Sequence, residues 1–170
     1  IVDESDIAPV IGSSASLTAS ENQTSIGSIT ATADVAGTAL TYTLSGVDAG
    51  ALSISDTGVL SFNTAPDYET QSSYSVTVTV SDGTNSTSSN LTIGVSNVND
   101  VAPVIGSSAS FTASENQTSV GTVTATDAEG DALTYALSGA DSSSLSVSDK
   151  GVLSFNVAPD YETQSSYSVT

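Results

Sequence analysis

Apolar side chains alternate with small polar ones along most of this chain. The alternation has a period of two over Tyr74–Val80 and again over Leu91–Val95, where Ser, Thr or Gly separates the apolar residues. A period of two predicts strands with one buried face. Turn-forming residues divide the first half into seven predicted strands, at about 9–19, 25–32, 39–45, 51–55, 58–63, 73–81 and 88–97. This pattern predicts an all-β, seven-stranded Greek-key sandwich of the immunoglobulin type.

The pattern occurs twice. The segment from Pro9, PVIGSSASLTASENQTSIGSITAT, recurs 94 positions later from Pro103 as PVIGSSASFTASENQTSVGTVTAT. The segment APDYETQSSYSVT around Pro66 recurs verbatim 93 positions later, so one residue is missing from a loop in between. Self-similarity at a fixed period indicates a tandem array. We therefore predict a first repeat over residues 7–99, a second over 100–170, and a linker from a preceding repeat over 1–6.

The second repeat stops at Thr170, partway into its predicted sixth strand. It is therefore expected to be incomplete and to lack its C-terminal strands, which would leave an unpaired sheet edge. We expect either that the sequence is a window on a longer chain or that another chain supplies the missing strand.

Composition excludes several function classes. The chain has no His, Cys or Trp, and Lys150 is its only basic residue, against 19 acids and a net charge of −18. Ordinary general bases, thiolate nucleophiles and basic phosphate clamps are therefore missing, and we predict that the protein is not an enzyme. The negative charge disfavours nucleic acid as a partner. No apolar run is long enough for direct membrane insertion.

The acids gather at predicted strand ends, in four clusters. The clusters are Ser20-Glu21-Asn22, Asp67-Tyr68-Glu69, the segment NVNDVAP over Asn97–Pro103, and Asp127-Ala128-Glu129. Together they resemble the xEx, DRE/DYE, DxNDxxP and DxD motifs of the cadherin repeat. The chain is most similar to the cadherin-like tandem repeats of bacterial surface and extracellular proteins, the large calcium-dependent adhesins.

This resemblance implies Ca²⁺ as cofactor, held where two repeats meet. Calcium takes about six to eight oxygen ligands from carboxylates and carbonyls. The ligands implied by the resemblance are Glu21, Asp67, Glu69, Asn97, Asn99, Asp100, Asp127 and Glu129. Asn97 and Glu129 stand where the family usually has Asp, so we expect fewer or weaker ions than in the family.

Two further sites follow from the same resemblance. The N-terminal junction has an eroded pattern, with Asp3, Asp6, Asp34 and Asp82 as weaker candidate ligands. In the second repeat, Glu115, Asp160 and Glu162 would serve a next junction that this sequence does not include.

Simpler explanations compete with these assignments. Acids at loop ends often only face solvent, and the turn residues Asp48, Asp56, Asp141 and Asp149 are expected to be structural. Tyr42, Phe62, Tyr135 and Phe155 are expected in the core. Two carboxylates such as Asp67 and Glu69 could in principle hydrolyse a glycoside. Calcium binding explains the same acids more economically.

The expected function is a calcium-rigidified extracellular repeat that acts as a spacer or structural element of a surface adhesin or matrix fibre. The alternative is a directly adhesive module that self-associates or binds glycans. The expected location is the cell surface or extracellular space. The expected partners are neighbouring repeats of the same chain, with like chains in a fibre as a further candidate.

Overall fold

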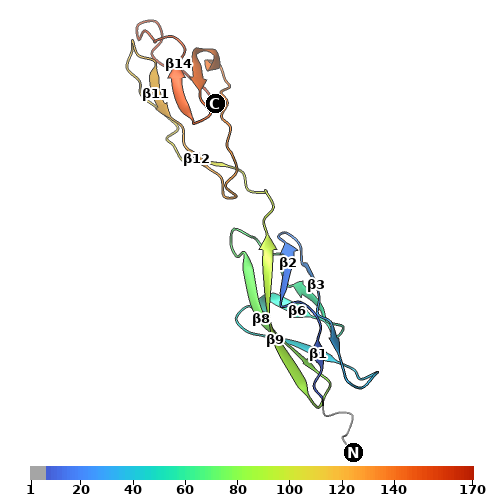
Figure 1. The fold of residues 1–170 in the computed structure, drawn as a ribbon. Helices are drawn as coiled ribbons and strands as arrows, with labels where there is room; N and C mark the ends of the chain where they lie inside the picture. The colour runs from blue at the N-terminus through green and yellow to red at the C-terminus, as the bar shows by residue number, and fades with distance from the viewer. Residues whose placement is uncertain (1–6) are drawn as a thin grey trace, which may run out of the picture. The chain divides into compact units, whose positions relative to one another are not determined.

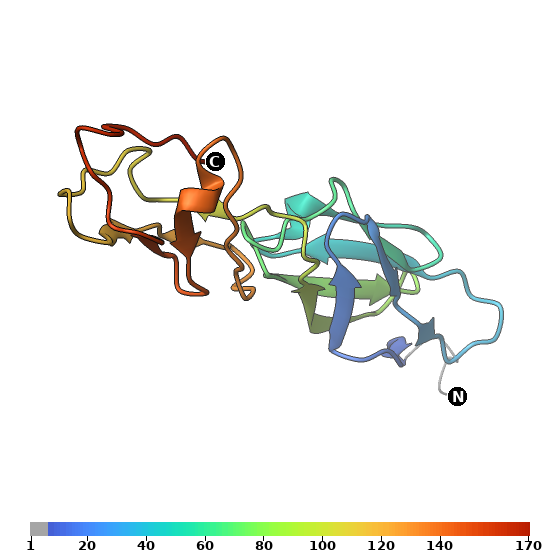
Figure 2. The same ribbon diagram turned by 90° about the horizontal axis from the view of Figure 1, so that it is seen from above.

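A computed structural model describes residues 7–170 of the chain. The chain divides into two compact units, Ile1–Asn99 and Asp100–Thr170. Within the described range both units are built from β-strands and contain no α-helix (Figures 1 and 2). The only helical pieces in this range are two single-turn 3₁₀ helices, η1 (Ala49–Ala51) and η2 (Ser142–Ser144). The all-β prediction is therefore confirmed. The predicted linker over residues 1–6 lies outside the described residues.

Unit 1 is a sandwich of strands. One sheet has the order β2-β9-β8-β5, formed by Ser16–Ser20, Ser86–Ser96, Ser73–Ser81 and Thr41–Ser45. A second sheet has the order β3-β7-β6, formed by Ser25–Ser28, Val59–Phe62 and Leu52–Ile54. A short pair joins β1 (Val10–Ile11) to β4 (Ala31–Thr32). All pairs are antiparallel except β2 with β9, which is parallel.

The first two predicted strands are each divided in the structure, and this corrects the predicted boundaries. The predicted strand at 9–19 is in fact β1 and β2, which pair in different sheets. Just after β1, the Gly12 N–H donates to the Thr30 carbonyl at 2.9 Å. Beyond this bond the chain crosses to the other sheet, where β2 pairs with β9. The predicted strand at 25–32 is likewise divided into β3 and β4, and a register shift lies at Ser25–Gly27. An alternating pattern does not reveal such a switch, because apolar residues face the same core from either sheet.

The core of unit 1 lies between these sheets. Leu60, Val80 and Ile93 have no solvent exposure, and they come from β7, β8 and β9. Phe62 is buried as predicted, and Tyr42 is half-buried against the same cluster. The intervening Ser and Thr residues of β8 and β9 face outward, which is the arrangement that the period of two predicts.

Unit 2 repeats one half of this sandwich. Strand β11 (Ser119–Thr122) pairs with β14 (Val152–Phe155), β14 pairs with β13 (Leu145–Val147), and β10 (Val104–Ile105) pairs with β12 (Ala125–Thr126). The sheet that corresponds to β2-β9-β8-β5 is not formed within residues 100–170. Its traces are a reciprocal pair of backbone bonds between Ser138 and Thr170, at 2.7 and 2.8 Å, and a bond from the Asp141 N–H to the Ser168 carbonyl at 3.3 Å.

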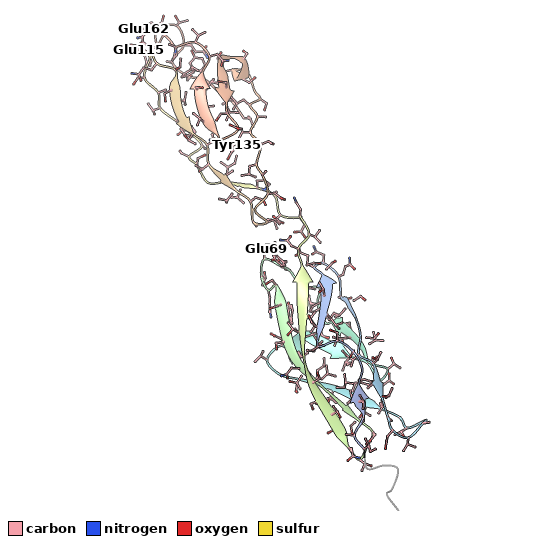
Figure 3. All side chains as sticks on the ribbon, viewed as in Figure 1. Glu69, Glu115, Tyr135 and Glu162 are labelled. Atoms are coloured by element: carbon pink, nitrogen blue, oxygen red, sulfur yellow. The ribbon has the colours of Figure 1, made fainter. Side chains whose placement is uncertain are left out.

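The core of unit 2 is correspondingly open. Leu145 and Leu153 are its buried apolar residues, and an open hollow of about 470 Å³ lies beside them. Phe155 and Tyr135 (labelled in Figure 3), predicted as core residues, are only half-buried. Residues 100–170 contain no counterpart of residues 78–96, which include β9 and its core residues Leu91 and Ile93.

Candidate metal-binding site

The turn at Asp67–Gln71, called the acidic turn below, carries two of the predicted ligands of unit 1. The Asp67 carboxylate accepts hydrogen bonds from the backbone N–H groups of Glu69 and Thr70, at 3.0 and 3.3 Å, and from the Thr70 hydroxyl at 2.9 Å. The Gln71 N–H donates to the Asp67 carbonyl at 2.9 Å. Aspartate favours such turns because its short side chain bonds to the backbone that follows it. These bonds within the turn stabilise it, and the turn carries Glu69.

Glu21 follows β2 and is the one buried charged residue among those described, with 1% of its surface exposed. Its Oε2 accepts from the Tyr68 N–H at 2.8 Å, and its Oε1 accepts from the Val98 N–H at 2.5 Å. The next residue, Asn22, has a φ of 61°, a left-handed conformation that Asn tolerates better than most residues. Glu21 thus connects three separate segments of unit 1: the end of β2, the acidic turn and the residues after β9.

Glu21 and Glu69 lie close together. Each offers a carboxylate oxygen within 4.8 Å of the other. The Asn97 amide donates to Glu69 Oε1 at 3.2 Å, so this predicted ligand also reaches the group. In Figure 3, Glu69 lies at the end of unit 1 where β9 finishes. The structure therefore brings together Glu21, Glu69 and Asn97 within one unit.

The acidic group recurs in unit 2. Glu115, Asp160 and Glu162 each offer one carboxylate oxygen, and these three oxygens lie within 4.8 Å of one another. Figure 3 shows Glu115 and Glu162 side by side at one end of this unit. The Tyr161 N–H donates to Glu115 Oε2 at 3.3 Å, as Tyr68 does to Glu21 in unit 1. The three acids predicted for the next junction are therefore gathered, and two of them, Glu115 and Glu162, are the counterparts of Glu21 and Glu69.

At the start of unit 2, Glu129 folds back onto the linker segment. Its Oε1 accepts from the backbone N–H groups of Asp100 and Val101, at 3.1 and 2.8 Å. Its Oε2 is shielded from solvent and has no hydrogen-bond partner. Asp127 Oδ1 accepts from the N–H groups of Glu129 and Asp131, which fixes the loop. An orphaned carboxylate oxygen in this position fits a cation ligand, because buried polar groups normally have a partner.

The remaining candidates lie in turns of their own. Asp34 accepts from the Val35 N–H at 2.9 Å, and Asp82 accepts from the N–H groups of Thr84 and Asn85 at 2.8 and 2.7 Å. Asp3 and Asp6 lie outside the described residues. Among the described residues, the predicted N-terminal junction is thus represented by two acids that each fold back on the adjacent backbone.

These hydrogen bonds lower the pKa of several exposed carboxyl groups. The Thr70 hydroxyl contributes most to lowering the pKa of Asp67 below its ordinary value of 3.8, and the Asn85 N–H does so for Asp82. In unit 2, the Thr163 hydroxyl lowers the pKa of Asp160, and the Ser168 N–H lowers that of Asp141. All four groups are therefore ionised at neutral pH.

The same shifts predict an acid-induced loss of stability. A carboxyl group whose pKa is lower in the folded state stabilises the fold above the unfolded value of about 3.8, and this contribution disappears as the pH falls through the folded pKa. In chelator, we expect melting temperatures recorded from neutral pH to well below 3.8 to drop more gradually for Asp67→Asn than for the wild type. An equal decrease of the melting temperature with falling pH in the variant and the wild type would contradict this prediction.

The donor set suits a hard cation. All the gathered side chains offer oxygen, and Ca²⁺ prefers carboxylate and carbonyl oxygens. The chain has a single basic residue, Lys150, in a turn of unit 2. The acids of unit 1 therefore have no basic side chain of their own unit to neutralise them.

Sequence reasoning missed one feature of the site. Asp48 is predicted to be an ordinary turn residue, yet its carboxylate accepts a hydrogen bond from the Gln71 side chain beside the acidic turn. The available signal was that both residues recur in the second repeat, as Asp141 and Gln164.

Comparison with known proteins agrees with this architecture. The sequence pattern described as "Bacterial Ig domain" matches residues 5–94 and 99–170. Repeats EC22-24 of mouse cadherin-23 are 26% identical with a TM-score of 0.79, covering 93% of this chain and 56% of that one. Repeats EC1-4 of Drosophila N-cadherin are 27% identical with a TM-score of 0.72, covering 93% and 42%. No curated protein sequence matches the chain.

Human protocadherin-24 EC1-2 gives a third match, with 25% identity, a TM-score of 0.76, and coverage of 93% of this chain and 81% of that one. The chain spans about half the length of the cadherin-23 fragment. The predicted resemblance to cadherin-like repeats and the predicted tandem immunoglobulin-type fold are both confirmed.

Among residues 7–170, no helix is long and apolar enough to cross a membrane.

Proposed function

Because this chain belongs to the bacterial Ig domain family and has the fold of cadherin repeats, we propose that it is a calcium-rigidified extracellular spacer. It would form part of a surface adhesin or matrix fibre, with neighbouring repeats as its first partners. Like chains in a fibre are a second class of partner. The fold is that of structural and adhesive modules, and the proposed role involves no catalysis.

The observation that carries this proposal is the repeated acidic turn. Glu21 with Glu69 in unit 1, and Glu115 with Asp160 and Glu162 in unit 2, bring carboxylate oxygens together at matching places. Sequence duplication alone preserves residues, whereas here the hydrogen bonds that orient the acids are preserved as well. Holding like charges together costs free energy, which a bound cation would offset.

The proposed ligands come from three parts of the chain. Unit 1 supplies Glu21, Asp67 and Glu69, and the linker supplies Asn97, Asn99 and Asp100. Unit 2 supplies Asp127 and Glu129. Calcium would supply positive charge and a set of oxygen contacts that restrains all three segments at once. Without it, the acids repel one another and the linker between the units is free to bend.

Small-angle X-ray scattering of the full chain tests the spacer role. We expect a larger radius of gyration and a narrower distance distribution in millimolar calcium than in chelator. The double variant Asp127→Asn, Glu129→Gln serves as a control, because it should keep both units folded and make the dimensions insensitive to calcium. Wild-type dimensions that are identical in calcium and in chelator would rule out the spacer mechanism.

One observation favours a second candidate, a directly adhesive face. None of the Asp and Glu residues described in unit 1 lies in a strand, so the outer face of the sheet β2-β9-β8-β5 carries no charge. Hydroxyl and amide groups pair across it, as Thr77 with Asn90 at 3.0 Å and Thr79 with Ser88 at 2.8 Å. An uncharged polar face of this kind suits a glycan or the same face of another copy.

Sedimentation velocity and a glycan array test this second candidate. Concentration-dependent association in calcium, or binding to a glycan that Thr79→Asp abolishes, would support it. A strictly monomeric protein without glycan binding would eliminate it and leave the spacer role.

A further inference from the structure

The acidic turn of unit 1 is anchored at its far end by Asp48. Gln71 Nε2, at the end of the turn, donates to Asp48 Oδ1 at 3.2 Å and to the Ser73 carbonyl at 3.0 Å. The other carboxylate oxygen, Asp48 Oδ2, accepts from the Ser75 N–H at 2.7 Å. Asp48 precedes η1 in the connection between β5 and β6, so this contact fastens the turn to a different segment of the unit.

The turn is therefore held at both ends. At its start, the Asn22 N–H donates to the Pro66 carbonyl at 3.0 Å, and the Tyr68 N–H donates to Glu21. At its end, Gln71 is bound to Asp48. Glu69 projects from between these two anchors. A turn fastened at both ends limits how far Glu69 can move away from Glu21.

The same anchor is present in unit 2. Gln164 Nε2 donates to Asp141 Oδ1 at 3.0 Å and to the Ser166 carbonyl at 2.9 Å, and the Ser168 N–H donates to Asp141 Oδ2 at 2.7 Å. The sheet corresponding to β2-β9-β8-β5 is not formed within residues 100–170, yet the acids stay gathered. The anchor and the turn therefore keep their geometry without the support of that sheet.

From this we infer that Asp48 and Gln71 form a positioning pair, which holds the acidic turn in the form that binds a divalent cation. Asp48 is not itself a ligand in this inference, because it does not belong to the gathered acids. Its two oxygens accept hydrogen bonds from Gln71 and Ser75. The inference rests on the proposed function. It adds that calcium affinity depends on a contact between two residues outside the ligand set.

Charge and position predict opposite results for one substitution. Gln71→Glu adds a negative charge beside the acidic turn, which would strengthen calcium binding if charge alone mattered. It also places two carboxylates against each other and breaks the contact with Asp48. If Asp48 and Gln71 act by holding the acidic turn in place, Gln71→Glu must weaken calcium binding. The swap Asp48→Asn, Gln71→Glu restores a donor and an acceptor between positions 48 and 71 with the wild-type net charge, but not the bond from Gln71 to the Ser73 carbonyl.

The experiment measures the calcium midpoint of the full chain, meaning the calcium concentration that half-saturates the site. It is fitted from the rise of the melting temperature over a calcium series. We expect Gln71→Glu and Gln71→Ala to raise the midpoint about 5-fold, the factor expected for one net hydrogen bond. The swap variant should recover part of this loss, because it restores the contact between positions 48 and 71. Gln164→Ala is the matched control in unit 2. It should leave the midpoint read from the unfolding of unit 1 unchanged, because Gln164 does not contact the acidic turn of unit 1.

Melting temperatures in chelator report separately on the fold. A purely structural pair would lower the melting temperature in chelator and leave the midpoint unchanged, which would overturn the inference. A midpoint that Gln71→Glu leaves the same or lowers, or a loss that the swap does not reduce, would also overturn it. Failure of the proposed function looks different, since the wild type itself would then show no calcium dependence.

Discussion

Replacement of Glu21 by Ala is expected to destabilise unit 1 by about 2 to 5 kcal/mol even without calcium. The substitution leaves two part-buried N–H groups, those of Tyr68 and Val98, without their acceptor. Each unsatisfied buried group costs about 1 to 3 kcal/mol. Amide exchange in chelator measures the effect, because the amides of Val78 and Ile93 in the central strands report on global unfolding of this unit.

Glu115→Ala is the matched control in unit 2. Glu115 is exposed and accepts one longer hydrogen bond, from the Tyr161 N–H at 3.3 Å. Its removal should cost under about 1 kcal/mol, since exposed hydrogen bonds contribute little. Equal costs at the two positions would contradict the structural role assigned to the buried carboxylate of Glu21.

Gly58→Ala is expected to destabilise unit 1 by a comparable amount, for a steric reason. Gly58 has a φ of +80°, and a β-carbon there would lie 2.3 Å from the Ile29 carbonyl oxygen and 3.2 Å from the Tyr42 ring. A left-handed residue with a β-carbon costs about 1 to 2 kcal/mol, and overpacking adds about 1 to 3 kcal/mol. Urea unfolding in chelator should show the combined loss.

Gly83→Ala separates the two contributions. Gly83 also has a positive φ, of +97°, but a β-carbon there would have no atom within 4 Å. Its replacement should therefore cost only the conformational part, about 1 to 2 kcal/mol. A Gly58→Ala cost no larger than that of Gly83→Ala would mean that the close approach of Ile29 is readily relieved.

Periodicity in the sequence predicts the fold class well but not the path of the first strand. Ser and Thr alternate with Val, Ile and Leu so regularly that the central strands β8 and β9 appear close to their predicted bounds. The switch of the chain between sheets after Gly12 is not predictable in this way. Pairing partners depend on which backbone groups meet in space, and the side-chain pattern is the same for both sheets.

The candidate site shows a similar division. The motifs around Glu21 and Glu69 predict that acids gather, and the structure brings these two side chains together. Burial of Glu21 was not predictable, because it depends on Val98, 77 residues away, donating to its carboxylate. The contact of Asp48 with Gln71 was missed because each residue has a common local role in turns. The assignment of calcium ligands across the linker remains a prediction.

A calcium titration followed by thermal melting of the full chain tests the central claim most directly. Extracellular calcium modules bind with dissociation constants of about 10⁻⁴ to 10⁻³ M. Ligand at ten times its dissociation constant stabilises the folded state by about 1.4 kcal/mol. We therefore predict a melting temperature that rises through the millimolar range of calcium, and a smaller rise with magnesium, which demands stricter geometry. A melting temperature that is the same in chelator and in saturating millimolar calcium would contradict the account.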